Sequence, residues 1–516
     1  MNKQTIIERV MKPIIEKGYE AYFVGGCVRD KIMGITPHDY DICTNATPEQ
    51  LHNIFSKFSN VSNNSENFGV TMPLISFIDE NGNTAFEQIE IATFRKDKTS
   101  GRHPIVSFTS DIEEDASRRD FTINALYEDI NGNIIDPTNQ GIEDAKNKIL
   151  RFVGSPRERI NEDPLRLFRF VRFLATKGLK PAHSFVQIST ISKDVSFKEI
   201  SKERQLKELE QIIAGKYFLD TDVMNHFWCS GIPEQTKISY VRSLLTTVTQ
   251  SWKWHAEGSV FKDKEGKSHV IKDKNTIIEK DWVPVTNGNA WEHTLLVMNN
   301  MRNKCWDNEK PLFDEHTRFK LMLAAMLHDI GKGFSCLEYK KNIITINGKE
   351  YSELIPKVSN HAEEGFPVAA SLCKNLGMSN NDITFISELV RLHMEMHKLS
   401  EIKSKYKIMK ITTHPYFKEL CMLAICDEEG CVKLEKDIWP GIKAALETEK
   451  IKSCLVTEIP KPILTGNDLI KKGEKPSPLF RKKLEKALQF QIDDGISDKE
   501  ELYKMVKGVT LYMTKK

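Results

Sequence analysis

A glycine pair at the end of an apolar run constrains the N-terminal part of the chain most strongly. Residues 21–26 read AYFVGG, and CVRDKIMG follows directly. This order predicts a strand that turns sharply at Gly25 and Gly26 into a helix beginning at Cys27. Glycines let the backbone approach a phosphate group, and a helix N-terminus offers unpaired N–H groups to an anion. Arg29, one turn into the helix, can donate two parallel hydrogen bonds to phosphate oxygens.

Two carboxylates follow this turn at a spacing of two residues. Asp39 and Asp41 flank Tyr40 in a β-rich segment, so both side chains are expected on one face of a strand. Adjacent carboxylates repel each other unless cations neutralise them. Mg²⁺ takes oxygen ligands and leaves room for substrate phosphates. A glycine pair or a DxD alone is usually an ordinary turn, but the two in this order predict a two-metal site that activates a hydroxyl and stabilises a leaving pyrophosphate.

The length of 516 residues predicts three or four folded units, because one hydrophobic core does not grow to this size. Short β-rich runs alternate with helices at the start, and helical periodicity dominates later, which predicts an α+β architecture. A stretch near the middle is polar and charged, with glycines at turn positions. The expected units are an α/β head over 1–153, an all-α neck and body over 154–249, a polar insertion or hairpin-bearing linker over 250–284, an α-helical domain over 285–450 and a helical tail over 451–516.

Charge and cysteine usage narrow the class of protein. The net charge is only +2, so a nucleic-acid partner would need a local basic surface; the densest basic stretches are 151–172 and 471–486. The ten cysteines form no CxxC pair, which argues against a structural zinc site. The first 20 residues predict an amphipathic helix rather than a signal peptide, and no apolar run approaches 18 residues. We expect a cytoplasmic protein with free thiols and no membrane span.

Five motifs give the head a family resemblance. GGCVRD with DYDI, then IEIATFRKD, SRRDFTINAL, IIDPTNQGIEDAKNKILRFVG and NEDPLRLFRFVRF, occur in this order across residues 21–176. The set resembles the head domain of class II tRNA nucleotidyltransferases and bacterial poly(A) polymerases, within the polymerase-β-like superfamily. The resemblance implies that Asp39 and Asp41 are catalytic ligands of Mg²⁺. Glu90 matches an acidic position of the family, as a third carboxylate or as a solvated strand glutamate.

The last of these motifs resembles the family's EDxxR motif, which reads the incoming base. Asp163 only accepts hydrogen bonds and Arg166 only donates them. Cytosine and adenine both present an acceptor beside an amino donor, so this pair could satisfy either base. Uracil and guanine present the opposite order and would leave buried groups unpaired, at ~1–3 kcal/mol each. The resemblance further implies that Arg169, Arg172 and Arg119 contact the nucleotide.

Arg166, Arg169 and Arg172 also allow a plainer interpretation. They recur every three residues on one helix, where like charges destabilise each other by a few tenths of a kcal/mol per pair. An anionic partner would relieve this repulsion. The alternative to nucleotide binding is therefore a surface that faces RNA or pairs with carboxylates.

Two further segments match the family. Residues 95–108 resemble its flexible loop for switching from C to A, and ISKERQLKEL resembles its neck helix.

A second constellation lies in the helical region. His328 and Asp329 are adjacent at the end of an apolar helix, with His293 upstream and Asp427 downstream. This order resembles the H…HD…D ligand set of the HD phosphohydrolase superfamily. Mixed histidine and carboxylate ligands suit a divalent transition metal such as Ni, Mn, Zn or Fe, which would activate water. Two further histidines match family positions, where they bind a second metal, orient a phosphate or lie in the core: His361 and His393.

Together the resemblances imply a template-independent enzyme that adds CCA to tRNA 3′ ends from CTP and ATP. The HD domain would hydrolyse 2′,3′-cyclic phosphates and related phosphoesters. A tail that resembles the segment after related HD domains would help to hold the RNA. Three alternatives remain: a poly(A) polymerase, an enzyme that adds only CC or only A, and an HD phosphohydrolase whose head binds RNA without catalysis.

Overall fold

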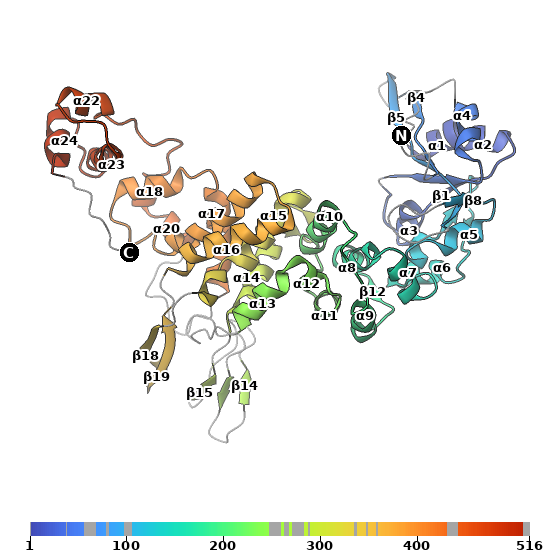
Figure 1. Ribbon diagram of the computed structural model, residues 1–516, viewed down its shortest axis with the longest axis horizontal. Coiled ribbons are helices and arrows are strands. Elements are labelled where there is room, and N and C mark those ends of the chain that lie inside the picture. Colours follow the sequence, from blue (N-terminus) through green and yellow to red (C-terminus); the bar gives the residue numbers. More distant parts are fainter. Residues whose placement is uncertain are drawn as a thin grey trace. The chain divides into compact units, whose positions relative to one another are not determined.

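The computed structural model divides into two compact units, residues 1–239 and 240–516 (Figure 1). The finer boundaries expected from the sequence remain predictions. The structure describes residues 2–37, 39–55, 69–78, 82–97, 106–246, 260–262, 268–270, 283–286, 289–334, 338–346, 349–357, 360–430 and 442–508.

The first unit begins with a mixed sheet in the order β10-β9-β1-β2-β6-β3. β2 and β6 pair in parallel, and the other neighbours pair antiparallel. This sheet places the end of β1 beside the start of β2, because Val24 lies opposite Asp41. The six strands are β1 (Ala21–Val24), β2 (Asp41–Thr44), β3 (Val70–Thr71), β6 (Ile91–Thr93), β9 (Tyr127–Glu128) and β10 (Ile134–Ile135).

Short helices and small strand pairs surround this sheet. The helices are α1 (Lys3–Ile6), a π-helical turn (Ile7–Met11), α2 (Lys12–Glu16), α3 (Gly26–Ile32), α4 (Pro48–Phe55), α5 (Ile112–Ser117), a 3₁₀ turn (Thr122–Asn124) and α6 (Gly141–Lys146). The paired strands are β4 (Leu74–Ile78) with β5 (Thr84–Gln88), β7 (Arg95–Asp97) with β8 (Val106–Phe108), and β11 (Ile149–Leu150) with β12 (Lys180–Pro181). Of the expected switching loop, residues 98–105 lie outside the described part of the chain.

Aromatic side chains fill the core of the head. Tyr127 and Phe94 are fully buried and meet edge to face at 6.2 Å between ring centroids. Phe121 and Phe152 lie 5.0 Å apart and extend this core toward the helices that follow. Large buried rings of this kind contribute much of a small domain's stability. They hold the sheet edge that carries Asp41 in a rigid frame.

The helical remainder of this unit differs in one respect from the sequence expectation. One helix was expected from about Arg157 to Thr176, but α7 (Pro156–Glu162) and α8 (Leu165–Lys177) are separate. Asp163 between them is extended, with φ −144° and ψ 102°, because the ring of Pro164 disfavours a helical residue before it. α9 (Phe185–Ser192), α10 (Lys202–Ile213), α11 (Thr221–Cys229) and α12 (Ile232–Thr236) follow, and α10 packs against α8.

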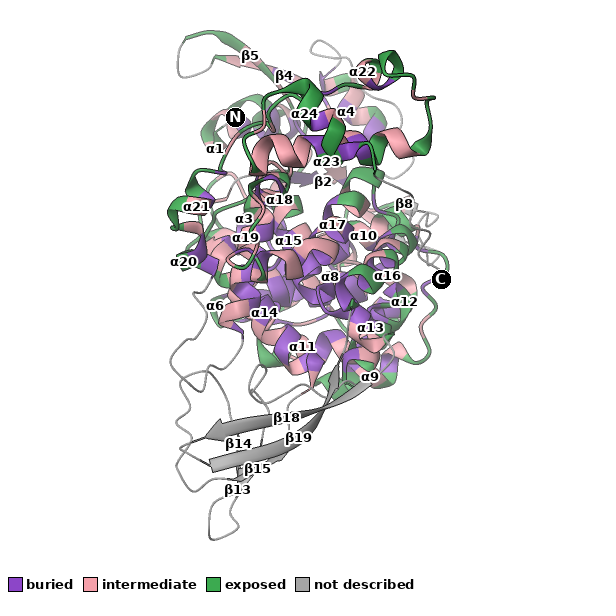
Figure 2. Ribbon diagram, turned by 90° about the vertical axis from the view of Figure 1, so that its left-hand side faces the viewer, coloured by how far each residue is buried: buried purple, intermediate pink, exposed green. Residues whose placement is uncertain are grey.

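The second unit is a helical assembly. Buried residues line α8 in the first unit and α15 in the second, whereas α24 is largely exposed (Figure 2). The helices are α13 (Ile238–Thr246, shared with the first unit at its start), α14 (Ala290–Cys305), α15 (Glu315–Leu327), a 3₁₀ turn (Ile330–Gly333), α16 (His361–Leu376), α17 (Asn380–His397), α18 (Lys405–Thr412), α19 (Phe417–Glu429), α20 (Ile442–Leu446), α21 (Glu449–Lys452), α22 (Gly466–Lys471), α23 (Pro478–Asp493) and α24 (Lys499–Val506).

Strands interrupt the region that was expected to be helical throughout. β18 (Glu338–Ile346) and β19 (Lys349–Lys357) form an antiparallel pair between α15 and α16. The sequence carries the signal for this hairpin, an Asn-Gly dipeptide between two β-rich runs, and the expectation of continuous helix overlooked it. A shorter pair, β16 (Trp306–Asp307) with β17 (Lys310–Pro311), follows α14.

The polar stretch at 250–284 lies mostly outside the described residues. Within it, β13 (Val260–Lys262) pairs antiparallel with β14 (Ser268–Val270), and β15 (Val283–Thr286) pairs with β13.

The eight cysteines within the described residues are free. None of the described helices has the length and apolar character needed to cross a membrane.

Candidate active sites

The predicted catalytic carboxylates lie at one edge of the head sheet. Asp41 is the first residue of β2, and Asp39 precedes the strand by two positions. Glu90 lies directly before β6 and accepts a hydrogen bond at its backbone oxygen from Ile42, which brings it beside Asp41. All three residues are exposed. The sheet therefore gathers the three predicted oxygen ligands, including the one whose role the sequence left open.

The charges of these carboxylates affect one another. Partial loss of hydration and the Asp39 charge raise the pKa of the Asp41 carboxyl, while Arg119 opposes this shift. Partial loss of hydration and the Asp41 charge raise the pKa of the Glu90 carboxyl. Mutual repulsion among exposed carboxylates is the situation that a bound cation relieves. A set of carboxylate oxygens with room around it suits Mg²⁺, which keeps several water or phosphate ligands.

The glycine turn forms as predicted, with the helix starting one residue earlier. Gly25 has φ +74° and precedes α3, which begins at Gly26. The positive φ is the conformation that glycine adopts without steric cost. A β-carbon at Gly25 would lie 4.0 Å from Arg119 Nη1, and one at Gly26 would lie 3.7 Å from Arg29 Nη2. Two guanidinium groups therefore border the turn.

Arg29 is held by its neighbours rather than pointing into open solvent. It is 5% exposed, and its Nη1 donates a hydrogen bond to Asn124 Oδ1 at 2.8 Å. Its Nη2 lies 2.7 Å from Asp30 Oδ1. The sequence did not indicate these partners. They fix the guanidinium beside Gly26 and reduce the side-chain entropy lost when an anion binds there.

Arg119 belongs to a buried ionic cluster around Asp115. Its Nη2 lies 3.0 Å from Asp115 Oδ2, and its Nε donates to the Tyr127 hydroxyl at 3.0 Å. Tyr127 in turn donates to Asp115 Oδ2 at 2.8 Å, and Arg118 binds the other carboxylate oxygen at 2.6 Å. Arg118 thus helps to balance the charge of Asp115. The cluster orients Arg119 toward the turn and toward the charge of Asp41.

The arginine row on α8 is paired with carboxylates, which was the plainer of the two interpretations. Arg166 Nη1 lies 2.6 Å from Glu162, and Arg166 Nη2 donates to the backbone oxygen of Arg118. Arg169 Nη2 lies 2.6 Å from Asp120, and Arg172 Nε lies 3.3 Å from Glu208 on α10. The repulsion along the row is therefore relieved within the protein. Each guanidinium is positioned by its carboxylate, a role for these acids that the sequence did not reveal.

Asp163 stands at the junction between α7 and α8. Its Oδ1 accepts a hydrogen bond from the backbone N–H of Leu165 at 3.0 Å, as a helix-capping carboxylate does. Its Oδ2 lies 3.8 Å from Arg204 on α10. The guanidinium of Arg166 pairs with Glu162, whereas the Arg166 backbone N–H donates to the backbone oxygen of Asp163 at 2.9 Å. Base reading by Asp163 and Arg166 remains a prediction.

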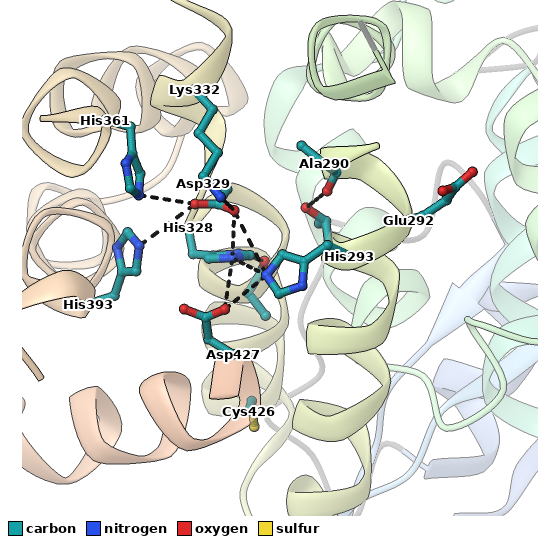
Figure 3. Close-up of polar contacts among 12 residues, drawn as sticks. Ala290, Glu292, His293, His328, Asp329, Lys332, His361, His393, Cys426 and Asp427 are labelled. Carbon is teal, nitrogen blue, oxygen red and sulfur yellow. Dashed lines mark hydrogen bonds and ion pairs between the residues drawn. The ribbon is translucent and has the colours of Figure 1, made fainter. Parts of the chain in front are cut away.

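The predicted HD residues converge from α14, the turn after α15, α16, α17 and α19 of the second unit (Figure 3). His293 on α14 lies with its Nε2 at 2.9 Å from Asp427 Oδ1 on α19 and at 3.3 Å from His328 Nε2. The ligand atoms of these three residues all lie within 4.8 Å of one another. All three are buried, which is costly for a charged cluster unless each charge is compensated. In the sequence, only the resemblance to a known ligand set linked these residues. In the structure, they lie next to one another.

A second group adjoins the first. Asp329, His361 and His393 also have their ligand atoms within 4.8 Å of one another. Asp329 Oδ1 lies 3.3 Å from His361 Nε2, whereas Asp329 Oδ2 lies 3.4 Å from His328 Nε2. The two oxygens of one carboxylate therefore face the two histidine groups. Lys332 lies 2.5 Å from Asp329 Oδ2 and adds a positive charge at this carboxylate.

The hydrogen bonds of the histidines suit metal ligation. Nδ1 of His328 bonds the backbone oxygen of Ala325 at 2.8 Å, and Nδ1 of His393 bonds that of Val390 at 2.7 Å. Such bonds fix the tautomer that leaves Nε2 as a lone-pair donor. Nε2 of His393 is buried and has no hydrogen-bond partner among the described residues. An orphaned imidazole nitrogen aimed at buried carboxylates is what a divalent cation would satisfy.

Burial and charge set the protonation of this cluster. Burial lowers the pKa of His393 to about 3, assisted by the charges of His328 and His361, so His393 is neutral. Burial alone would raise the pKa of the Asp329 carboxyl, but Lys332 and His328 hold it well below its usual range. The cluster therefore combines ionised carboxylates with a neutral imidazole. This is the donor set that transition metals bind.

His397 is a residue of this site that the sequence analysis missed. Its Nε2 lies 2.7 Å from Asp427 Oδ2, on the side of the carboxylate away from His293. A signal was present, because His397 follows His393 by four residues and the two share one face of α17. Asp115 and Asp120 were missed as well, although both lie within five residues of Arg119.

Comparison with known proteins defines the two domains. Residues 21–151 match the poly(A) polymerase head domain family, and residues 290–434 match the HD domain family. The chain thus contains two known domain types, a poly(A) polymerase head domain followed by an HD domain.

The named relatives are CCA-adding enzymes. The chain is 40% identical over 210 residues to that of Lactococcus lactis subsp. lactis, which covers 40% of this chain and 50% of the relative. It is 39% identical over 231 residues to that of Ligilactobacillus salivarius, covering 42% and 53%. The chain matches about half the length of these curated relatives.

Solved structures share the fold over nearly the whole chain. The CCA-adding enzyme of Bacillus stearothermophilus in complex with CTP superposes with a TM-score of 0.54 at 18% identity, covering 98% of each chain. That of Thermotoga maritima complexed with tRNA superposes with a TM-score of 0.50 at 19% identity, covering 98% of this chain and 97% of the other. At these identities the likeness concerns the fold.

Proposed function

We propose that the head adds nucleotides to the 3′ end of tRNA without a template, using CTP and ATP to build CCA. The observation that carries the proposal is the carboxylate edge of the head sheet, where Asp39, Asp41 and Glu90 lie near Gly25 and the guanidinium of Arg119. The named relatives are CCA-adding enzymes, and one solved neighbour is a complex with CTP. Asp39 and Asp41 would hold Mg²⁺, with Glu90 as a further oxygen donor.

Bound Mg²⁺ would lower the pKa of an attacking hydroxyl and neutralise a leaving pyrophosphate. The protein's own residues supply the rest. Arg29 and Arg119, each fixed by a carboxylate, would bind the triphosphate beside the glycine turn. Asp163 and Arg166 would read the base edge, and Glu162 would keep Arg166 in position. Arg169 and Arg172 would complete the nucleotide surface.

The RNA partner requires a local basic surface, since the net charge is only +2. One such surface is a cleft of about 320 Å³ between α18 and α23 in the second unit. Four lysines and one glutamate line it, so its charge is +3 by count. The lining residues are Tyr406, Lys407, Lys410, Lys482, Glu485, Lys486 and Gln489. A lysine-rich cleft suits the phosphate backbone of a nucleic acid.

The experiment for the head uses tRNA transcripts that end before CCA, at C or at CC. Each is incubated with Mg²⁺ and labelled CTP, ATP or both, and product length is resolved on a gel. Stepwise extension to CCA, with no further growth, supports the proposal. Long adenosine tails would identify a poly(A) polymerase. Arrest after CC, or addition of A alone, would identify a partial enzyme. No extension at all would leave a non-catalytic head.

We propose that the HD domain is a metal-dependent phosphohydrolase acting on 2′,3′-cyclic phosphates and related phosphoesters. The two adjoining ligand groups around Asp329 support one divalent metal at His293, His328 and Asp427 and a second at His361 and His393. The metal would activate water for attack on phosphorus. Conversion of 2′,3′-cyclic AMP to adenosine monophosphate is measured after chelation and after addition of Ni²⁺, Mn²⁺, Zn²⁺ or Fe²⁺. Hydrolysis that depends on none of these metals would refute this proposal.

The two activities would act on the same RNA end. Hydrolysis of a 2′,3′-cyclic phosphate at its bond to the 3′ oxygen would leave a 2′-phosphate and free the 3′-hydroxyl needed for nucleotide addition. This order predicts that a tRNA ending in a 2′,3′-cyclic phosphate is extended only when the HD domain is active. That outcome separates one repair enzyme from two unrelated activities in one chain.

A further inference from the structure

We propose that His397 is a positioning residue that selects which oxygen of Asp427 faces the metal ligands of the HD domain. The proposal rests on the metal site proposed above and concerns a residue outside the ligand set. Asp427 Oδ1 lies 2.9 Å from His293 Nε2 and 3.8 Å from His328 Nε2. Asp427 Oδ2 points the other way and lies 2.7 Å from His397 Nε2. The carboxylate is therefore held from both sides.

The location of His397 distinguishes it from a ligand. Among the described residues, the two groups that could hold a metal contain other histidines, and His397 belongs to neither. It is the last residue of α17, and its side chain is 25% exposed, whereas the side chains of His293 and His328 are 1% and 0% exposed. His397 thus covers the outer side of Asp427 and leaves the inner side to the cluster.

The bond has a clear consequence for Asp427. A carboxylate can rotate about its last side-chain bond and present either oxygen, or both, to a metal. A hydrogen bond from the His397 ring to Oδ2 opposes this rotation and commits Oδ1 to the ligand cluster. Residues that orient a metal ligand in this way contribute ~10–100-fold to metal affinity without touching the metal.

The α17 helix carries both His397 and a histidine of the second ligand group. His393 and His397 lie one turn apart on the same face of α17. His393 Nε2 lies 3.9 Å from Asp329 Oδ1, and His397 binds Asp427. One helix thus places a ligand in one group and orients a carboxylate in the other. A shift of α17 would affect both groups together.

The test is calorimetric titration of the full chain with Ni²⁺, with excess Mg²⁺ present to occupy the carboxylates of the head. His397→Leu removes the donor, and His397→Gln keeps an N–H donor on a side chain of similar reach. His414→Leu is the matched control, because His414 is 21% exposed in the same unit and pairs with Glu388 outside the site. We expect the Ni²⁺ Kd to rise ~10–100-fold in His397→Leu, to stay within about three-fold in His397→Gln, and to be unchanged in His414→Leu.

Two results would overturn the proposal. Wild-type affinity in His397→Leu would mean that the bond to Asp427 does not orient the ligand. Equal loss in His397→Leu and His397→Gln would mean that the imidazole itself binds metal. If His397→Leu does not fold, His397→Ala takes its place, because it also removes the donor to Asp427. Wild-type protein that binds Ni²⁺ but hydrolyses no phosphoester would refute the proposed activity and leave the positioning role standing.

Discussion

Asp115 and Arg119 form a buried ion pair of 3.0 Å inside the head, one helical turn apart in sequence. Asp115 is 0% exposed and also binds Arg118. Burial alone would raise the pKa of the Asp115 carboxyl, but Arg119 and Arg118 outweigh burial and lower it to about 2. The ion pair thus orients a guanidinium assigned to nucleotide binding and makes the stability of the head depend on pH.

The pH dependence has a definite sign. The folded pKa of Asp115 lies below its unfolded value of 3.8, so the ion pair contributes stability above pH ~4. This contribution of roughly 2 kcal/mol is lost as the pH falls from about 4 to about 2. We expect Asp115→Asn to lower the free energy of unfolding by about 3 kcal/mol at pH 7, because two guanidiniums lose their counter-ion.

Urea unfolding of wild type and Asp115→Asn at a series of pH values measures this dependence. The gap between the two proteins should narrow as the pH falls through the window from 4 to 2. Glu114→Gln is the matched control: Glu114 lies beside Asp115 on α5 but forms an ion pair at the surface with Lys96. It should change stability little at any pH. A gap that stays constant down to pH 2.5 would contradict the assignment.

The carboxylate edge of the head should be needed for nucleotide addition alone. We expect Asp39→Ala or Asp41→Ala to abolish CMP incorporation into tRNA, because each removes a predicted Mg²⁺ ligand. Hydrolysis of 2′,3′-cyclic AMP should remain, since its residues lie in the other compact unit. Glu113→Ala, an exposed change in the same head, is the control and should retain both activities. Equal loss of both activities in a folded Asp39→Ala protein would refute two independent sites.

Asp329 should have the opposite dependence. Its two oxygens face the two histidine groups, so Asp329→Ala would disrupt both. We expect metal-stimulated phosphohydrolysis to vanish and CMP incorporation to persist. Chelation of the wild type should have the same effect on hydrolysis, and Ni²⁺ or Mn²⁺ should restore it. Glu401→Ala, an exposed change in the same unit, serves as control. Hydrolysis at the wild-type rate in Asp329→Ala would exclude this site as its source.

Local patterns in the sequence predicted the elements of the head better than the side-chain pairs that connect them. The strand, the glycine turn and the position of Asp41 follow from local patterns, because apolar runs, glycines and alternation act over a few residues. The pairing of Arg169 with Asp120 spans 49 positions, and that of Arg172 with Glu208 spans 36, so no local pattern contains it. The positive charges of the arginine row therefore seemed to lack carboxylate partners when only the sequence was considered.

The HD site shows the same limit. The order of His293, His328, Asp329 and Asp427 suggested a ligand set, but the partition into two groups on the two sides of Asp329 depends on how α14, α15, α16, α17 and α19 pack together. His397 was overlooked because a histidine four residues after another resembles an ordinary amphipathic repeat. Only the packing of α17 against α19 shows that His397 contacts Asp427.

The lysine-rich cleft between α18 and α23 should contribute to RNA affinity through phosphate contacts. Asp493 fixes the two helices together, since it accepts from the Ser404 hydroxyl at 2.6 Å and from the Tyr406 N–H at 2.9 Å. The double variant Lys407→Ala/Lys482→Ala should weaken tRNA binding ~5–10-fold per lysine at 0.1 M salt and reduce the slope of log K against log salt by about 2.

Filter binding across a series of KCl concentrations tests this cleft. Lys374→Ala/Lys418→Ala removes the same charge from exposed positions on α16 and α19 and is the matched control. It should change the salt slope little, because those lysines lie outside the cleft. Equal effects of the two double variants would mean that only net charge matters. Wild-type binding by the cleft variant would place the RNA on another surface.

The choice of base tests Asp163, which has a second role as a helix cap. Its Oδ1 accepts from the Leu165 N–H, so loss of the side chain removes a cap as well as any contact with the base. Asp163→Ala alone therefore cannot separate the two roles.

Asp163→Asn can separate them. Asparagine caps a helix about as well as aspartate, but its amide offers donors where the carboxylate only accepts. If Asp163 reads the base, Asn should admit uracil and guanine, whose edges present the opposite order. The ratio of kcat/KM for CTP over UTP should then fall ~10–100-fold in Asp163→Asn, from ~1–3 kcal/mol per unpaired group, with little change in stability. Arg119→Ala should instead weaken all four nucleotides nearly alike, because Arg119 is assigned to the triphosphate. The measurement is kcat/KM for CTP, ATP, UTP and GTP on a tRNA primer, beside the unfolding free energy of each variant. Wild-type selectivity in Asp163→Asn, together with uniform slowing in Asp163→Ala, would mean that Asp163 is a cap and that another residue reads the base.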